Sequence, residues 1–356
     1  KEVINLSSNN YLGLTTHPKL RRAAIDATRK FGVGSGAVRA IAGTMKMHMD
    51  LEEQIARFKK VEACVVFQSG FTANSGTVSA ILGKDDLIIS DELNHASIID
   101  GCRLSKATIK VFRHKDTADC ERVLKETENW TGKKLLVTDG VFSMDGDIAD
   151  LPALCELAER FNCIMMVDDA HSSGILGSRG RGTIDHHNCH GRVDIQVGTL
   201  SKAVGSIGGY VCGSRDLIEF LYHRGRPFLF STSHPPSVVA TCQAAFELLD
   251  SEAGEKVIKK LWANTKFFKR KLRKLGFNTG KSETPITPIM VGDAGKAHEF
   301  SRELFAEGVF AGAIGYPVVA EGKARLRTIV TAAHKRADLE RAAEIIGRVG
   351  KKLAVI

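Results

Sequence analysis

The sequence predicts an α/β protein built on a mostly parallel, doubly wound sheet of seven strands, with a smaller α+β region after it. Between about residues 60 and 213, short apolar runs rich in β-branched residues alternate with segments of helical length. The runs lack polar alternation, which is typical of strands covered by helices on both faces. The predicted strands are residues 63–67, 86–90, 108–112, 135–139, 163–169, 194–198 and 209–213.

Length and pattern together predict three parts along the chain. With 356 residues, the chain is longer than one hydrophobic core usually supports. Residues 1–30 are expected to form an arm and a leading helix, and residues 31–240 the large domain that carries the site. Residues 241–356 are expected to form the small C-terminal α+β domain, with strands at 286–292, 308–314 and 325–331.

Composition narrows the class of protein. Hydrophobic residues make up 43% of the chain, yet no apolar run reaches the roughly 18 to 20 residues that a membrane span requires. The opening segment lacks the features of a signal or transit peptide, so we expect a cytoplasmic protein without a membrane partner. The net charge of +9 is spread along helical segments such as 266–274, which favours a solvated helix face over nucleic-acid binding. A weaker interpretation is attraction of a polyanionic small molecule such as a coenzyme A (CoA) derivative.

Cysteine and histidine give no metal prediction. The eight cysteines are scattered singly and form no CxxC pair, so they are expected to be reduced. The densest cluster of possible ligands is residues 186–190, which contains three histidines and one cysteine. Adjacent residues rarely converge on one ion without a second cluster elsewhere, and we therefore expect a surface loop there and no metal.

Polar residues follow four of the predicted strands, and a parallel sheet would bring these ends to one edge. Gln68–Asn74 follows the first strand and opens a helix, where backbone amides next to a glycine can cradle a phosphate. Asp91–Ser97 follows the second strand, and its His95 is either a loop residue or a ring that stacks on a flat cofactor.

The two remaining strand ends carry a carboxylate and a lysine. Asp168 and His171 follow the apolar run 163–167, and a carboxylate buried there needs a cationic partner; a structural ion pair or a helix cap is the alternative. Lys202 follows Gly198–Ser201, and a lysine among small residues at a strand end is suited to Schiff-base chemistry.

Seven segments in order resemble one enzyme family. The segments SGF, DELNHAS, TDGVFSMDGD, VDDAH, GTLSKA, RPFLFSTS and GKARLRT lie between Asn9 and His334 and cover nearly the whole chain. They resemble the α-oxoamine synthases, which are pyridoxal-phosphate (PLP) enzymes of fold type I that condense an amino acid with an acyl-CoA. The resemblance therefore implies a PLP-dependent acyltransferase.

The resemblance also implies a role for individual residues. Lys202 would carry PLP as a Schiff base, Asp168 would pair with the pyridine nitrogen, His171 would bond the phenolic oxygen, and His95 would stack on the ring. Gly70 and Phe71 amides and the Thr199 hydroxyl would bind the phosphate, and Ser143 would lie beside His171. Ser231 and Thr232 would reach the phosphate from the partner subunit, which implies a homodimer with shared active sites. Arg327 would bind the substrate carboxylate, with Asn10 near it.

The substrates are predicted less directly, from shorter motifs. The segment Gly36–Thr44, together with DGDIADLP, GRGTIDHH and HGRVDI, resembles the glycine C-acetyltransferase branch, which predicts glycine and acetyl-CoA as substrates. The alternative is the 8-amino-7-oxononanoate synthase branch, which uses alanine and a pimeloyl-type thioester and releases CO2. Ala320 stands where many relatives have proline, which leaves the length of the acyl chain open.

Three rival classes make different predictions. A Rossmann dehydrogenase requires GxGxxG after the first strand, whereas Gly32–Gly36 precedes every predicted strand and lacks that spacing. A basic binding module predicts no chromophore and no consequence of changing Lys202. A PLP-fold protein that binds the cofactor without turnover is disfavoured by the presence of Lys202, Asp168, His171 and Arg327 together.

Overall fold

The computed structural model describes residues 2–356 and divides the chain into two compact units. The first unit comprises the chain up to Gly13, the segment Ser143–Ile148, and Lys256–Ile356. The second unit comprises Leu14–Phe142 and Ala149–Glu255. The three-part division by residue number stays a prediction.

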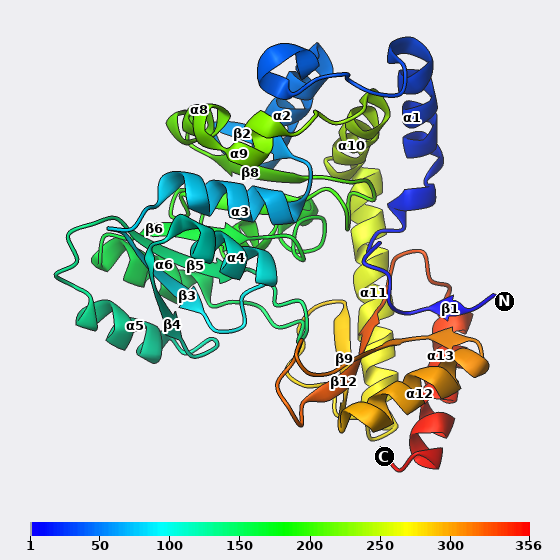
Figure 1. Ribbon diagram of the computed structural model, residues 1–356. Coiled ribbons are helices and arrows are strands. Elements are labelled where there is room, and N and C mark those ends of the chain that lie inside the picture. The colour runs from blue at the N-terminus through cyan, green and yellow to red at the C-terminus, as the bar shows by residue number, and fades with distance from the viewer. Residues whose placement is uncertain (1) are drawn as a thin grey trace. The chain divides into compact units, whose positions relative to one another are not determined.

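The second unit is built on a seven-stranded sheet with the order β2-β8-β7-β6-β5-β3-β4 (Figure 1). Strand β8 is antiparallel to both of its neighbours, and the four other pairs of strands are parallel. The predicted α/β fold with a mostly parallel sheet is therefore confirmed. The strands are β2 (Ala63–Phe67), β3 (Leu87–Asp91), β4 (Thr108–Phe112), β5 (Lys134–Asp139), β6 (Ile164–Asp168), β7 (Ile195–Thr199) and β8 (Gly209–Gly213).

Apolar side chains cover both faces of this sheet. In β3, Leu87 and Ile89 belong to one buried cluster, with residues of α5 and α6, and Ile88 belongs to another, with residues of α3 and α4. Burial on both faces explains why the strands read as continuous apolar runs. The helices of the unit are α1 (Pro18–Phe31), α2 (Lys46–Lys59), α3 (Gly70–Ile81), α4 (Ala96–Ser105), α5 (Thr117–Glu126), α6 (Leu151–Arg160), α7 (Thr183–His186), α8 (Arg215–Arg224), α9 (Arg226–Phe230) and α10 (Pro236–Leu249), with short turns η1 (Leu14–Thr16), η2 (Arg39–Gly43) and η3 (Ser178–Gly180).

The first unit contains a three-stranded antiparallel sheet in the order β11-β12-β9 and a parallel pair of β1 and β10. The single strand predicted at 308–314 is two short strands, because the chain pairs with β1 before Ala311 and with β12 after it. The elements are β1 (Ile4–Asn5), β9 (Ile286–Gly292), β10 (Val309–Phe310), β11 (Gly312–Ile314), β12 (Ala324–Ile329), α12 (Ala294–Ala306) and α13 (Arg336–Lys352), and α11 (Glu252–Lys274) enters this unit from Lys256 onwards.

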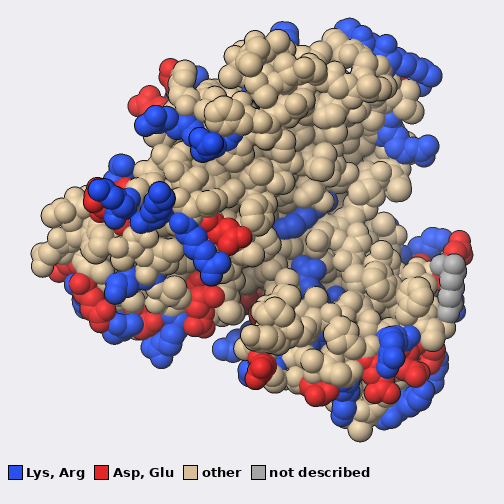
Figure 2. All heavy atoms as spheres, in the orientation of Figure 1, with Lys and Arg blue, Asp and Glu red and all other residues tan. Residues whose placement is uncertain are grey.

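The composition led to expectations about the cysteines, membrane spans, metal ligands and surface charge. All eight cysteines are free thiols, as expected. Across residues 2–356, no helix is long and apolar enough to cross a membrane, and no group of three or more potential ligands is arranged to hold a metal ion. On the face shown in Figure 2, basic and acidic side chains are interspersed.

Candidate active site at the carboxyl edge of the sheet

Lys202 and His171 meet at the carboxyl edge of the seven-stranded sheet. His171 lies three residues beyond β6, Lys202 lies three residues beyond β7, and the two strands are parallel neighbours. The Nζ atom of Lys202 is 2.8 Å from Nε2 of the buried His171. Two cations at this distance would repel each other, so the contact requires at least one of the groups to be uncharged. A neutral imidazole that accepts from the Lys202 ammonium satisfies this requirement, and it gives the amine a neighbour to which it can pass a proton before it acts as a nucleophile.

Asp168 ends β6 and is a buried carboxylate held by neutral donors. Its Oδ1 accepts the backbone N–H of Ala170 at 2.8 Å, and its Oδ2 accepts Nδ2 of Asn74 at 2.6 Å. Among the described residues, no lysine, arginine or histidine forms a salt bridge with it. A buried carboxylate without a cation is costly, which fits a site completed by the protonated ring nitrogen of a bound cofactor.

A second carboxylate, Asp139, lies next to Asp168. The two residues end neighbouring parallel strands and are in register. The pKa of Asp139 is raised well above its ordinary value, first because the group is buried and second because of the negative charge of Asp168. Asp139 also accepts the backbone N–H of His95 at 2.7 Å. The edge of the sheet therefore carries two acidic groups with different environments.

The start of α3 forms an anion cradle. Ser69 caps the helix in a reciprocal arrangement with Thr72, and the N–H groups of Gly70 and Phe71 have no acceptor within the helix. Unpaired amides at a helix N-terminus favour a phosphate group. A Cβ atom on Gly70 would lie 3.4 Å from Cβ of Thr199, so the Thr199 side chain borders the cradle.

The hydroxyls of Thr199 and Ser201 also border the anion cradle at the start of α3. Thr199 Oγ1 donates to the carbonyl of Gly208 at 2.9 Å and lies 2.7 Å from Oγ of Ser201. Because the Thr199 proton is used by Gly208, the contact between the two hydroxyls requires Ser201 to donate to Oγ1 of Thr199, and either hydroxyl would have to turn to donate to a phosphate. Glycine, two amides and hydroxyls at one helix end fit the phosphate of PLP.

His95 caps α4 and leaves its ring exposed. Its Nδ1 is 2.7 Å from Oγ of Ser97 and accepts the backbone N–H of Ser97 at 3.2 Å. The pKa of His95 is lowered, first by desolvation and then by the charge of Lys202, while Asp168 acts in the opposite direction. A neutral imidazole with one fixed edge is suited to stacking on a flat ring.

Ser231 and Thr232 follow α9. Thr232 is exposed, and its carbonyl accepts Nε2 of Gln68 at 2.9 Å, which ties this segment to the residue just before the cradle. Ser231 is half-buried. Their contribution to a partner subunit stays a prediction.

The first unit holds the remaining predicted residues, among them Arg327 on β12. Nε of Arg327 donates to the carbonyl of Ser143 at 2.5 Å, and both terminal nitrogens lie 3.4 Å from Oδ1 of Asn9. Burial lowers the pKa of Arg327, and its hydrogen bond with Tyr11 acts in the opposite direction. The structure gives Arg327 a contact with Asn9, whereas the role of the neighbouring Asn10 stays a prediction.

The two arginines of the RLR segment differ in their partners. Arg325 forms an ion pair with Asp145 at 2.5 Å. Within residues 2–356, Arg327 has no carboxylate at salt-bridge distance, and its contacts are neutral oxygens. A guanidinium without a carboxylate partner is free to bind the carboxylate of a substrate.

The structure adds residues that the sequence analysis did not single out. Asn74 lies four residues after Gly70 on α3, is fully buried and bonds Ser97 and Asp168, and Asp139 lies in register with Asp168 on the neighbouring strand. The signals were present in the sequence: an asparagine on an apolar helix face, and an aspartate that ends a predicted strand in register with Asp168. Asn74, Ser97, Asp139 and Ser201 all lie inside segments named in the sequence analysis, but no role was assigned to them there.

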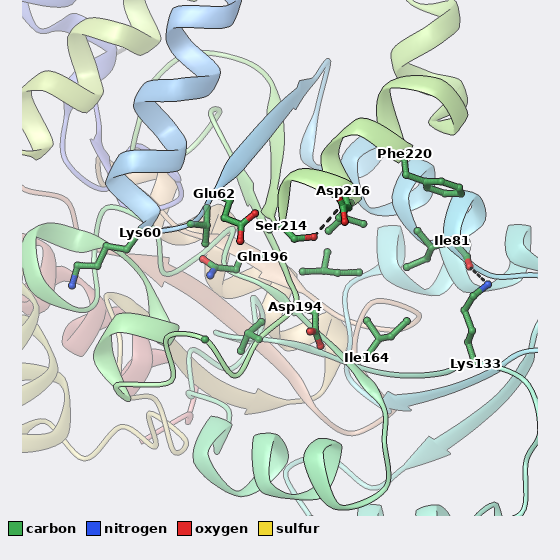
Figure 3. Close-up of a pocket in the computed structure, with 16 residues that line it drawn as sticks. Lys60, Glu62, Ile81, Lys133, Ile164, Asp194, Gln196, Ser214, Asp216 and Phe220 are labelled. Atoms are coloured by element: carbon green, nitrogen blue, oxygen red, sulfur yellow. Dashed lines mark hydrogen bonds between the residues drawn. The ribbon is translucent and has the colours of Figure 1, made fainter.

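Two cavities lie away from these residues. One, of about 690 Å³, lies in the second unit and is lined by residues at the amino ends of β6 and β7, including Ile164, Asp194 and Gln196 (Figure 3). The other, of about 550 Å³, is lined by five basic side chains of α11. None of the predicted site residues lines either cavity.

Comparison with known proteins defines the class. The model of the family Aminotransferase class I and II matches residues 1–346. A serine palmitoyltransferase from Sphingomonas wittichii superposes with a TM-score of 0.96 at 33% identity, covering 100% of this chain and 89% of that one. A structure described as SPT with the PLP internal aldimine superposes with a TM-score of 0.96 at 34% identity, covering 100% and 89%. The fold is that of a PLP-dependent transferase of fold type I.

Curated relatives define the branch more narrowly. Proteins named 8-amino-7-oxononanoate synthase from Thermoanaerobacter pseudethanolicus and Bacillus subtilis (the latter named 8-amino-7-oxononanoate synthase 1) are 60% and 55% identical over 356 residues, covering 100% of this chain and 90% of each relative. The chain belongs to the α-oxoamine synthase family, and its cofactor is PLP. These relatives overturn the predicted glycine C-acetyltransferase specificity for glycine and acetyl-CoA.

One of the four segments behind that prediction has a role in packing. Arg39, inside the segment Gly36–Thr44, forms a buried bidentate ion pair with Glu52, with both distances at 2.8 Å. It also bonds Thr44, and Glu52 accepts the N–H of Val66 on β2. The segment thus holds α2 against the sheet, and a packing requirement of this kind does not depend on the length of the acyl chain.

Proposed function

We propose that the protein condenses alanine with a pimeloyl thioester to form 8-amino-7-oxononanoate, CO2 and the free thiol. The observation that carries the choice of substrates is the 55–60% identity, over the whole chain, to enzymes of that name. The contact between Lys202 and His171, beside the buried Asp168, supports the chemistry.

The residues at the sheet edge would each have a separate role in the reaction. Bound PLP supplies a ring that accepts the electron pair left on the α-carbon of the amino acid. Lys202 would hold the cofactor and, once displaced by the amino acid, would take the α-proton at Nζ. His171 is placed to exchange a proton with that amine at 2.8 Å. Asp168 would keep the ring nitrogen protonated, and His95 would stack on the ring.

Other residues would bind the phosphate of the cofactor and the carboxylate of the substrate. Gly70, Phe71, Thr199 and Ser201 would hold the phosphate, as their position at the start of α3 supports. Arg327 would anchor the carboxylate of alanine, because it is a guanidinium with only neutral partners in its own unit. Asn10 and Ser143 keep the roles that the family resemblance implies.

A homodimer with shared sites is part of this proposal. Three large apolar side chains of the second unit, Val33, Ile41 and Phe230, are 83%, 84% and 69% exposed. Exposed apolar side chains are typical of surfaces that a partner covers. In the dimer, Ser231 and Thr232 of the partner subunit would complete the phosphate site. Sedimentation of the holoenzyme would distinguish a dimer from a monomer.

The test of the activity is release of thiol by the purified, PLP-loaded protein. Alanine, glycine and serine would each be combined with pimeloyl-, acetyl-, succinyl- and palmitoyl-CoA, and CO2 release would be followed in parallel. The expected result is a preference for alanine with pimeloyl-CoA, with thiol and CO2 in equal amounts. Lys202→Ala serves as the control and should lose both the visible absorbance and turnover.

Other outcomes would contradict specific parts. Preference for another acyl chain would exclude the proposed substrates but leave the cofactor site intact. A coloured holoenzyme without turnover on any pair would exclude acyl transfer itself. Visible absorbance that survives Lys202→Ala would exclude the role of that lysine.

A further inference from the structure

A chain of hydrogen bonds joins the predicted pyridine partner to the predicted stacking residue. Asn74 donates from Nδ2 to Oδ2 of Asp168 at 2.6 Å and to Oγ of Ser97 at 2.9 Å. Ser97 Oγ is in turn 2.7 Å from Nδ1 of His95. Asn74 and Ser97 are 0% and 1% exposed, so bulk water does not compete with these bonds.

The orientation of the Asn74 amide depends on the charge of Asp168. Both N–H groups of Nδ2 are used, whereas Oδ1 is buried without a hydrogen-bond partner. Rotating the amide by half a turn would direct Oδ1 at the carboxylate oxygen of Asp168, which would repel it. The observed orientation therefore requires an acceptor at Oδ2 of Asp168, as an ionised carboxylate provides.

The same chain fixes the tautomer of His95. Ser97 Oγ accepts from Asn74, so its own proton is available for His95. The backbone N–H of Ser97 also points at Nδ1, at 3.2 Å. A nitrogen that faces two donors carries no proton of its own, so the neutral ring has its proton on Nε2. The lowered pKa of His95 agrees with a neutral ring.

We propose that Asn74 is a positioning residue that aims the Asp168 carboxylate at the ring nitrogen of PLP and, through Ser97, holds His95 as its Nε2–H tautomer. The inference rests on the proposed roles of Asp168 and His95 and extends them to two residues that touch neither substrate nor cofactor. The Asn74 amide would thus position both the carboxylate that pairs with the ring nitrogen and the imidazole that stacks on the ring.

The charged surroundings of Asp168 determine what a pH titration would report. Asp139 faces it from β5, and Lys202 and His95 complete the ionisable groups whose charges act on this cluster. These groups are unchanged when Asn74 is replaced by an apolar residue of similar size. A shift in titration would therefore reflect the lost hydrogen bonds and not a lost charge.

The test compares Asn74→Leu, Asn74→Ala and a matched control in holoenzyme form. Thr77→Val is the control, because Thr77 lies on the same helix, is fully buried, and has a hydroxyl with no hydrogen-bond partner. Two readouts are used, namely the pH midpoint of the visible absorbance of bound PLP and the dissociation constant of PLP. We expect both Asn74 variants to shift the midpoint by about one pH unit or more and to bind PLP roughly tenfold to a hundredfold more weakly. Thr77→Val should match the wild type in both.

Ser97→Ala separates the two arms of the chain. It keeps the bond from Asn74 to Asp168 and removes both hydrogen bonds of the Ser97 hydroxyl. Only the longer contact from the backbone N–H at position 97 then holds Nδ1 as an acceptor, so the proton on Nε2 should become mobile. Selective ¹⁵N labelling of histidine would then show a mixture of tautomers for His95 in the variant and a single one in the wild type. The same tautomer population in both proteins would overturn this arm.

A last pair of variants distinguishes this proposal from the roles on which it rests. Asp168→Asn should shift the absorbance midpoint if Asp168 pairs with the ring nitrogen. A shift in Asp168→Asn, with wild-type values in both Asn74 variants, would overturn the positioning role alone. Wild-type values in Asp168→Asn would overturn the role of Asp168 itself, whatever the Asn74 variants do.

Discussion

Two neighbouring aspartates at the end of β6 show how the same side chain serves two purposes. Asp169 is fully buried and its Oδ2 lies 2.9 Å from Nζ of Lys59, whose side chain is also fully buried. Ser172 and Thr183 donate their hydroxyls to its other oxygen. Asp168, one residue earlier, is almost as buried but receives only neutral donors, from Ala170 and Asn74.

The two aspartates differ in whether the described residues supply a cationic partner. A carboxylate with its own cation is complete within the folded chain, and its removal should affect stability. Asp168 forms no salt bridge with a lysine, arginine or histidine among the described residues, so a cation from outside the chain can serve as its partner. PLP, with a ring nitrogen that can hold a proton, is a partner of this kind. The two aspartates should therefore respond differently to the same substitution.

Asp168→Asn should have the largest effect, and that effect should be on turnover. The amide keeps the shape of the side chain but cannot keep a ring nitrogen protonated, so turnover should fall by roughly a thousandfold, within the range found for groups that control a proton in catalysis. Stability should fall less than in Asp169→Asn, because no internal cation loses its partner, although one amide oxygen cannot accept from both Ala170 and Asn74. The measurement is kcat for thiol release, together with urea unfolding of the holoenzyme at fixed PLP concentration. A variant that unfolds readily but turns over normally would reverse the comparison.

Asp169→Asn should have the opposite profile. It leaves the Lys59 ammonium buried without its counter-ion, which typically costs about 3 to 5 kcal/mol of the free energy of unfolding. The kcat of the folded fraction should remain near the wild-type value. The measurement is the urea midpoint and slope of the holoenzyme. Lys59→Met combined with Asp169→Asn is the control, since removing both charges should restore part of the stability; no recovery would show that the ion pair is not the main loss.

The sequence was sufficient for much of the fold. The seven strands of the large sheet were predicted within two residues at either end, because burial on both faces leaves continuous apolar runs between turn residues. The break in the predicted strand 308–314 was not foreseen. It depends on which strands the chain meets on either side of Ala311, and β1, some three hundred residues earlier, is one of them.

The site was predictable in its strand ends and not in its interior. Asp168, His171 and Lys202 follow apolar runs, which makes them visible as polar groups at the edge of a parallel sheet. Asn74 lies inside a helix, and its role depends on which side chains the buried face of that helix contacts. Substrate specificity was predicted wrongly from Gly36–Thr44 together with DGDIADLP, GRGTIDHH and HGRVDI. In the first of these segments, Arg39 packs against Glu52.

His234 supplies a third case, a buried ionisable group with no partner at its Nε2. Burial, and then the charges of His48 and Arg39, lower its pKa from 6.5 to about 4. The unfolded chain therefore binds a proton between these values that the folded chain does not, and stability should fall as the pH drops from about 6.5 to 4. The total for this group is roughly 3 kcal/mol.

The comparison for His234 is with His234→Gln in a pH series of urea unfolding. The variant should lack the part of the pH dependence that His234 supplies, while His48, whose pKa is also lowered, remains in both proteins. Stability curves that stay parallel from pH 7 to pH 4 would mean that His234 does not remain neutral in the folded state. A confirmed slope would show how much stability a buried ionisable group in this unit loses when it becomes charged without a counter-ion.

Ser173→Ala should give the smallest effect and tests how much of the Lys59 site is ionic. Ser173 Oγ lies 3.2 Å from Nζ of Lys59 and 2.9 Å from the hydroxyl of Tyr210, while Lys59 keeps Asp169 and the carbonyl of Arg181. Loss of one neutral hydrogen bond should cost about 1 kcal/mol of the free energy of unfolding, with kcat unchanged. Tyr210→Phe, alone and combined with Ser173→Ala, would separate the two contacts of the hydroxyl. A loss of stability as large as that of Asp169→Asn would mean that the Ser173 hydroxyl, and not the Asp169 carboxylate, determines whether Lys59 can remain buried. Asp169 could then no longer serve as the structural counterpart of Asp168.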